Sequence, residues 1–215
     1  YNKAVWGDFN NDSYIDFLVP GNPTLIYENN KVNNFIKRTD ITLPSIEAGS
    51  AEWGDYNNDS YLDIIVSGTI YGTYTPLTKI YLNNNGASFS DQGQLSVQVC
   101  MSSVAWGDYD NDGDLDIILN GSTTVPDSYI YWYPGTPITK IFTNNGDNSF
   151  TELAGTTFTG LSKGYVRWGD IDNDGDLDVA ITGFTDLHVN KTEIYANKGN
   201  NTFELKYEMT TPGSR

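Results

Sequence analysis

The sequence is poor in the residues that most often carry catalysis, disulfide bonding or membrane insertion. Its 215 residues include one cysteine, Cys100, and one histidine, His188. A single thiol excludes an internal disulfide framework, and neither a Gly-x-Ser-x-Gly nor a His-Glu-x-x-His motif is present. No apolar run approaches the roughly 20 residues of a transmembrane helix. We therefore expect neither an enzyme nor insertion into a membrane.

Basic residues are also scarce. Twelve lysines and arginines stand against 28 aspartates and glutamates, which gives a formal net charge of −16. Nucleic-acid phosphates require a basic surface, so this balance argues against nucleic acid as a partner. Because the sequence begins at Tyr1 without a Met, we expect a processed chain or part of a longer one.

The acidic residues are concentrated in a motif whose clearest copy is WGDYDNDGDLDIIL, residues 106–119. If Asp108 is position 1, glycine stands at position 6, and the carboxylates at positions 1, 3, 5 and 9 are Asp108, Asp110, Asp112 and Asp116. Calcium takes six to eight oxygen ligands at about 2.3–2.6 Å, and a sharp turn wraps such oxygens around one point. This loop is therefore predicted to bind Ca²⁺.

The same eleven-residue frame begins at four tryptophans: Trp6, Trp53, Trp106 and Trp168. The chain is therefore a repeat protein with up to four calcium sites. Positions 1, 3, 5 and 9 of the four loops hold 14 carboxylates, and four bound Ca²⁺ ions would leave a net charge of about −8. The acidity is largely a signature of metal sites.

An EF-hand loop begins with the same pattern, but it needs a bidentate Glu at position 12 and a helix on each side. Position 12 is apolar in every copy: Val19, Val66, Leu119 and Ile181. The flanking runs are short, rich in branched apolar residues and bounded by Gly, Pro or Asn, which predicts strands. An Asp/Asn-rich hairpin turn without metal is the alternative for any single copy, but four copies in one register favour calcium.

Each repeat is predicted to form four strands, A to D, with the acidic loop between A and B. The aromatic residue of strand C precedes the Phe of strand D by 8 residues in all four repeats (27 to 35, 81 to 89, 142 to 150 and 195 to 203). That Phe precedes the next Trp by 18, 17 and 18 residues. Length therefore varies only in the connection from strand B to strand C.

Consecutive antiparallel units of about fifty residues, each too small to bury its own faces, predict an all-β fold: a β-propeller of four-stranded blades. We expect one domain, 1–215, with blades at about 1–44, 45–97, 98–159 and 160–215. The four tryptophans should pack between neighbouring sheets near the axis. Loop position 8 should be the first buried residue of strand B: Ile15, Leu62, Leu115 and Leu177. A β-sandwich with calcium turns is the alternative.

The repeats resemble FG-GAP/VCBS repeats, the calcium-binding blades of integrin α-subunit propellers. Three features carry the resemblance: the acidic loops, the Asn two residues after the strand C aromatic (Asn83, Asn144), and the Asn/Gly turn before the Phe. The resemblance implies metal ligation by side chains at positions 1, 3, 5 and 9 and by the backbone carbonyl at position 7. These positions are Asp8, Asn10, Asp12, Tyr14 and Asp16; Asp55, Asn57, Asp59, Tyr61 and Asp63; Asp108, Asp110, Asp112, Asp114 and Asp116; and Asp170, Asp172, Asp174, Asp176 and Asp178.

The first two loops depart from that pattern. Position 3 is Asn10 or Asn57, and position 6 is Ser13 or Ser60 in place of Gly. One carboxylate fewer and a strained turn residue should both weaken binding. The resemblance also implies seven blades, whereas this chain encodes four. If the two ends of the chain were joined, Phe203 would precede Trp6 by 18 residues, which equals the internal spacing. The chain is therefore expected to form either a closed four-bladed ring or part of a larger propeller.

The variable B-to-C connections are expected to lie opposite the calcium loops. They contain the aromatic residues Tyr71, Tyr74, Tyr129, Tyr131, Trp132 and Tyr133, and the fourth connection contains His188. Variable aromatic loops on a rigid scaffold suit recognition. We expect a secreted or cell-surface recognition or adhesion module that binds a glycan or a protein, and further blades or copies of the chain as partners. A polysaccharide-active enzyme domain and a structural repeat of a surface filament are the alternatives.

Five Asn-x-Ser/Thr sequons begin at Asn11, Asn58, Asn120, Asn190 and Asn200. Loop position 4, which holds the first two, is expected to point to solvent. In a eukaryotic secretory source we expect a glycan on Asn120 or Asn190.

Overall fold

The computed structural model describes residues 3–32, 34–125 and 135–212, which form four antiparallel sheets of four strands each. The first sheet contains β1 (Val5–Gly7), β2 (Asp16–Val19), β3 (Leu25–Asn29) and β4 (Phe35–Lys37), and the second contains β5 (Ile46–Gly54), β6 (Asp63–Ile70), β7 (Pro76–Asn83) and β8 (Phe89–Gln94). The third contains β9 (Cys100–Gly107), β10 (Asp116–Ser122), β11 (Pro137–Asn144) and β12 (Phe150–Glu152), and the fourth contains β13 (Val166–Gly169), β14 (Asp178–Phe184), β15 (Val189–Asn197) and β16 (Phe203–Pro212).

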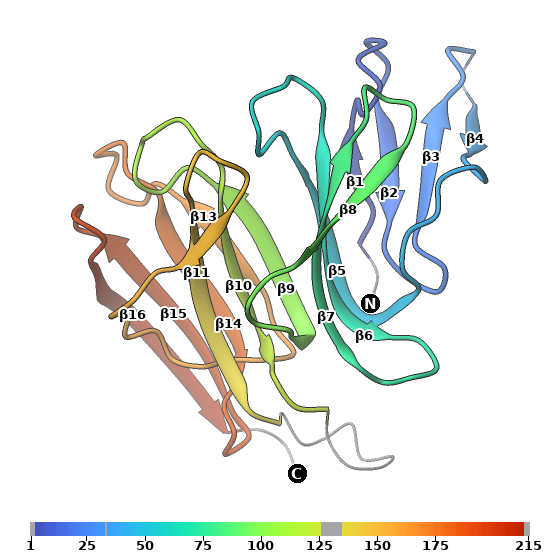
Figure 1. Ribbon diagram of the computed structural model, residues 1–215. Helices are drawn as coiled ribbons and strands as arrows, with labels where there is room; N and C mark the ends of the chain where they lie inside the picture. Colours follow the sequence, from blue (N-terminus) through green and yellow to red (C-terminus); the bar gives the residue numbers. More distant parts are fainter. Residues whose placement is uncertain (1–2, 33, 126–134, 213–215) are drawn as a thin grey trace.

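Every sheet uses consecutive strands in chain order, as blades of a propeller do. The predicted all-β blade architecture is confirmed, and each strand D begins at its predicted Phe. The acidic loops lie at one end of the sheets, along the upper edge of Figure 1, and the B-to-C connections lie at the other end. The described residues contain no helix that is long and apolar enough to cross a membrane.

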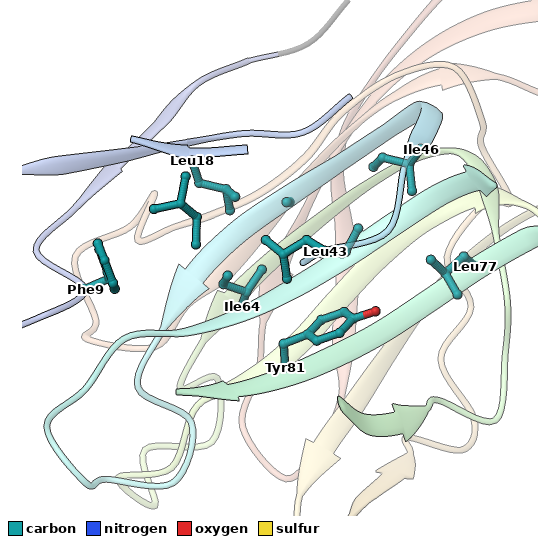
Figure 2. Packing of buried hydrophobic residues seen from close by; sticks show 10 residues of the cluster. Phe9, Leu18, Leu43, Ile46, Ile64, Leu77 and Tyr81 are labelled. Carbon is teal, nitrogen blue, oxygen red and sulfur yellow. The ribbon is translucent and has the colours of Figure 1, made fainter. Parts of the chain in front are cut away.

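Three hydrophobic clusters form the core, one at each boundary between neighbouring sheets. The cluster between the first two sheets joins Phe9 and Leu18 to Ile64 and Tyr81 (Figure 2). A second cluster joins Ile65 to Ile117, and a third joins Ile118 to Val179. The central strands β6 and β10 are buried almost throughout because a neighbouring sheet covers each of their faces.

Three of the four tryptophans pack as predicted, each against the preceding blade. Trp53, Trp106 and Trp168 stack on the position 2 aromatic of the previous loop at ring-centroid distances of 6.0, 5.8 and 6.0 Å. The prediction is wrong for Trp6, which is 64% exposed and lies over Phe17 and Phe35 of its own sheet. No described sheet covers it from outside, and a closed four-bladed ring is not shown.

The prediction for loop position 8 is also wrong. Ile15 is 52% exposed, and Leu62, Leu115 and Leu177 are half-buried and precede their strands. The first buried residue of strand B is the Asp at position 9 in all four repeats. A carboxylate takes the buried place because backbone N–H groups are aimed at it, as described below.

Candidate metal centre

The acidic loops fold around the carboxylate at position 1, which accepts hydrogen bonds from the backbone of positions 5 and 6. In the third loop the two oxygens of Asp108 lie 3.1 Å from the Asp112 nitrogen and 3.0 Å from the Gly113 nitrogen. Asp8 and Asp55 make the same pair of bonds, and Asp170 accepts from Gly175 at 3.2 Å. The chain is thereby wound tightly enough for alternate side chains to converge.

The winding requires left-handed backbone at two positions. Position 4 is Asn in every loop, with φ between 56° and 61°, and Asn tolerates this region better than most residues. Position 6 has φ 95° at Gly113 and Gly175, but φ 69° at Ser13 and 73° at Ser60. The two serines therefore carry backbone strain of roughly 1 kcal/mol that the two glycines avoid.

The carboxylate at position 9 joins the loop to strand C. Asp116 is fully buried and accepts from the backbone N–H of Tyr109 at 3.1 Å and of Asn144 at 2.8 Å. Burial raises its pKa to about 7, against the opposing effect of these hydrogen bonds. Burial likewise raises the pKa of Asp63 to about 7 and that of Asp16 to about 6. A nearby cation would stabilise the charged form of each group.

The third and fourth loops each bring three carboxylates together. One oxygen from each of Asp108, Asp110 and Asp116 lies within 4.8 Å of the others, and so does one from each of Asp170, Asp172 and Asp174. Oxygens on opposite sides of a calcium ion are about 4.6–5.2 Å apart, twice the ligand distance. An all-oxygen, anionic donor set of this size fits a hard cation such as Ca²⁺ and lacks the nitrogen and sulfur ligands typical of zinc.

The first and second loops hold fewer carboxylates, because Asn10 and Asn57 stand at position 3. Within these two loops, all of whose residues are described, no such group of three carboxylates forms. In the first loop the Lys31 ammonium lies 3.1 Å from a carboxylate oxygen of Asp12. In the second, the Asn57 amide donates to Asp59 at 3.0 Å. In both loops a carboxylate oxygen at position 5, which a bound cation would need as a ligand, already binds another side chain.

The side chains at position 7 do not join the carboxylate groups. Asp114 accepts a hydrogen bond from the side-chain amide of Asn58 at 2.7 Å, and Asp176 accepts one from Asn111 at 2.8 Å. Tyr14 is exposed and Tyr61 is half-buried. Ligation by the backbone carbonyl at position 7 stays a prediction.

Asn11 and Asn58 at position 4 are exposed, as expected, but each also binds the next blade. Asn58 reaches the next blade, and the amide of Asn11 likewise donates to the Ser60 carbonyl at 2.7 Å. The expected glycan on Asn120 is wrong, since that side chain is fully buried and donates to the Thr182 carbonyl at 3.1 Å. Asn190 is exposed, so the prediction for that sequon stands.

The last residue of strand C has a structural role that spacing alone did not reveal. The Asn144 amide donates to the Tyr56 carbonyl in the preceding loop at 2.8 Å, and its backbone binds Asp116. Asn83 and Asn197 make the same bonds to Phe9 and Tyr109. Their fixed place two residues after the strand C aromatic is the signal that could have identified them. Each acidic loop is thus tied to the neighbouring blade.

At the opposite end of the sheets, Tyr71 and Tyr74 project from the β6–β7 connection and are 53% and 57% exposed. Four of the predicted ligand-binding residues lie outside the described residues: Tyr129, Tyr131, Trp132 and Tyr133. His188 is half-buried in the β14–β15 connection. A hollow of about 310 Å³ lies between the third and fourth blades, lined by Thr136, Thr159, Thr185 and Asp186 among others. The end of the sheets opposite the acidic loops therefore presents tyrosine and threonine side chains.

Comparison with known families shows what the chain is similar to. It matches the FG-GAP-like repeat over residues 8–66, 70–119 and 126–181, which together include most of its length. A search of curated protein sequences finds no match to the chain. The matched ranges contain all four acidic loops except for the tryptophan and glycine that begin the first.

Proposed function

This chain belongs to the FG-GAP-like repeat family, and from that premise we propose that it is a calcium-binding, extracellular recognition module. The observation that carries the proposal is the convergence of three carboxylates to within 4.8 Å in each of the third and fourth loops. Calcium supplies positive charge that offsets the mutual repulsion of these groups. The predicted first and second sites complete a set of up to four.

The residues of the third loop explain how metal binding would stabilise the propeller. Asp116 holds the loop against β11 through the backbone of Asn144, and the amide of Asn144 holds the preceding blade. Charge on Asp116 is costly in this buried position unless a cation lies nearby. A filled loop therefore fixes both a blade and its contact with its neighbour.

Recognition is assigned to the end that carries Tyr71 and Tyr74. Tyrosine offers a large apolar face at low entropic cost and suits stacking on sugar rings or anchoring in a protein pocket. Calcium-stabilised blades would hold these connections rigid. We propose a glycan or protein as the ligand, a secreted or cell-surface location, and no catalytic role. Apart from Glu52, which is paired with Arg167, the carboxylates with raised pKa belong to the metal loops.

The proposal is tested by calcium titration followed by ligand screening on a glycan array. Tyr71→Ala and Tyr74→Ala should each reduce array binding at least tenfold without changing calcium affinity. Tyr207→Ala is the matched control, because Tyr207 is 52% exposed but lies on the outermost strand, β16. Equal losses from all three variants would contradict the assigned surface, and binding that persists in chelator would contradict its dependence on calcium.

A further inference from the structure

A separate hollow of about 310 Å³, here called the axial hollow, lies between the first strands of the four blades. Residues at or just before β1, β5, β9 and β13 line it. The first and fourth blades meet at its wall, where the Lys3 ammonium lies 4.0 Å from the ring centroid of Tyr165. Pro20 of the β2–β3 connection also lines it, so the axial hollow lies toward the end of the sheets opposite the acidic loops.

One position of the repeat supplies a lining residue from every blade. The residue three places before the tryptophan lines the axial hollow in all four blades: Lys3, Ser50, Ser103 and Tyr165. Two places earlier the backbone is left-handed in the second, third and fourth blades, with φ between 46° and 58°: Ala48, Met101 and Lys163. Because three blades make the same turn, their lining residues enter the hollow at equivalent places. The four blades therefore present different side chains to one shared space.

The lining of the axial hollow is basic, although the chain as a whole is acidic. Three of the chain's 12 lysines and arginines line it: Lys3, Lys163 and Arg167. Glu52 is the one carboxylate among the described residues of the lining. Three positive charges thus stand against one negative charge, and a local surplus of positive charge attracts anions.

The arginine and the glutamate of the lining bind each other. The Nη2 atom of Arg167 lies 2.9 Å from Oε1 of Glu52. Its Nη1 atom donates to the backbone carbonyls of Val104 and Val166 at 3.2 and 2.8 Å. The surplus charge therefore belongs to the two lysines. Burial lowers the pKa of Lys163, and an anion beside this ammonium would favour its charged form.

We propose that the axial hollow binds a small organic anion whose carboxylate or phosphate group contacts Lys3 and Lys163. Lysine binds both kinds of oxyanion as a compact point charge. The Ser50 hydroxyl accepts a hydrogen bond from the Val104 nitrogen at 3.0 Å, and its own proton can be donated to a ligand oxygen. Tyr165 supplies apolar surface for the carbon skeleton. Pockets for small molecules begin at about 300 Å³, so the hollow has room for one such ligand.

The net charge of −16 does not prevent this binding, because the acidic loops are remote. Asp55 opens the second loop five residues after Ser50. Along an extended strand this is about 16 Å, at 3.2–3.4 Å per residue, whereas the Debye length at physiological ionic strength is about 8 Å. Calcium in the loops would reduce the opposing charge further. The site is also separate from Tyr71 and Tyr74, so it extends the function proposed above and does not depend on their role.

Calorimetric titration at constant free calcium, with three hexoses that differ only at one carbon, tests the proposal: glucose, glucuronate and glucose 6-phosphate. At least one of the two anions should bind the chain about tenfold more tightly than neutral glucose, as expected for a hydrogen bond to a charged group. The tighter of the two identifies the acid group that the hollow prefers. If neither anion binds more tightly than glucose, the proposal is wrong.

Charge variants locate the bound anion. Lys3→Gln and Lys163→Gln should each weaken its binding about tenfold, whereas Lys3→Arg keeps the charge and should weaken it less. Lys37→Gln is the matched control, because it removes an exposed lysine from β4, on the outer edge of the first blade. Lys3 is exposed and precedes β1, so Lys3→Gln should melt like the wild type even if Lys163→Gln does not. Equal losses in Lys3→Gln and Lys37→Gln would overturn the proposal, since they would show a response to net charge alone.

Discussion

The ammonium nitrogen of Lys31 lies 3.1 Å from a carboxylate oxygen of Asp12, at position 5 of the first acidic loop. Lys31 comes from the turn between β3 and β4, at the same end of the sheet as the loop. A calcium ion in the first loop needs the oxygen that this ammonium uses. We therefore expect the first loop to bind calcium weakly, because of this competitor as well as Asn10 and the strained Ser13.

Replacing Lys31 by Met should strengthen calcium binding to the first loop. An exposed ion pair is worth about 0–1 kcal/mol, so the expected gain in affinity is up to about fivefold. Isothermal titration calorimetry of Lys31→Met against the wild type measures it. Lys37→Met, which removes an exposed lysine of β4, is the matched control and should change affinity less. An unchanged weak-binding phase in Lys31→Met would show that the ammonium does not compete.

The ranking of the four loops can be measured directly. Asp112→Ala and Asp174→Ala each remove the position 5 carboxylate from a loop with four carboxylates and Gly at position 6. We expect these variants to lose more thermal stability in calcium than Asp12→Ala or Asp59→Ala, because the all-Asp loops attract a dication more strongly. If Asp12→Ala or Asp59→Ala abolishes the tightest binding phase, the ranking by carboxylate count is wrong.

Without calcium, stability should fall as the pH rises. The pKa values of Asp63 and Asp116 are raised by burial to about 7 and that of Asp16 to about 6, above the ordinary value of 3.8. The folded state therefore binds protons more tightly than the unfolded state. The stabilisation is complete below about pH 4 and is lost as the pH rises through 6 to 7.

Melting curves in chelator test this prediction, and the midpoint should be several degrees higher at pH 5 than at pH 7.5. Calcium should reverse the order, because it competes with protons for the same carboxylates. Asp116→Asn, which cannot ionise, should reduce the pH dependence in chelator. A chelated protein that melts at the same temperature at both pH values would contradict the raised pKa values.

The asparagine at the end of strand C should matter most where it crosses to another blade. Asn144→Ala leaves the buried Tyr56 carbonyl without its 2.8 Å donor, and an unsatisfied buried polar group costs about 1–3 kcal/mol. Asn29→Ala is the matched control, since the Asn29 amide bonds within its own blade. Chemical denaturation should show a larger loss of unfolding free energy for Asn144→Ala, and equal losses would contradict the cross-blade role.

The sequence predicted the blades because their signals are local and repeated. The strand C aromatics, the Phe that begins each strand D and the acidic loops fall where spacing and hydrophobic pattern placed them. Only two of the loops were expected to hold four carboxylates, and those two bring three oxygens together. Side-chain spacing along one hairpin is sufficient for that inference.

Contacts between blades were harder to predict, because each joins residues that are far apart in sequence. Trp6 has the same motif as Trp53 but is exposed, since burial depends on a preceding blade and not on the motif. Asn120 carries a sequon but lies in β10 and bonds to Thr182 of the next blade. The Asn at position 4 of the loop is exposed, yet Asn11 and Asn58 each donate a hydrogen bond to the next blade.

The melting temperature with and without chelator tests whether calcium binds the acidic loops and stabilises the blades. Extracellular calcium modules have Kd values near 10⁻⁴–10⁻³ M, and at about 2 mM free Ca²⁺ a site with a Kd of about 0.1 mM contributes roughly 1.8 kcal/mol. Two or more filled sites should raise the melting temperature at pH 7.5 by at least several degrees, and magnesium at equal concentration should raise it less. A melting temperature that is the same in calcium and in EDTA would contradict the calcium assignment.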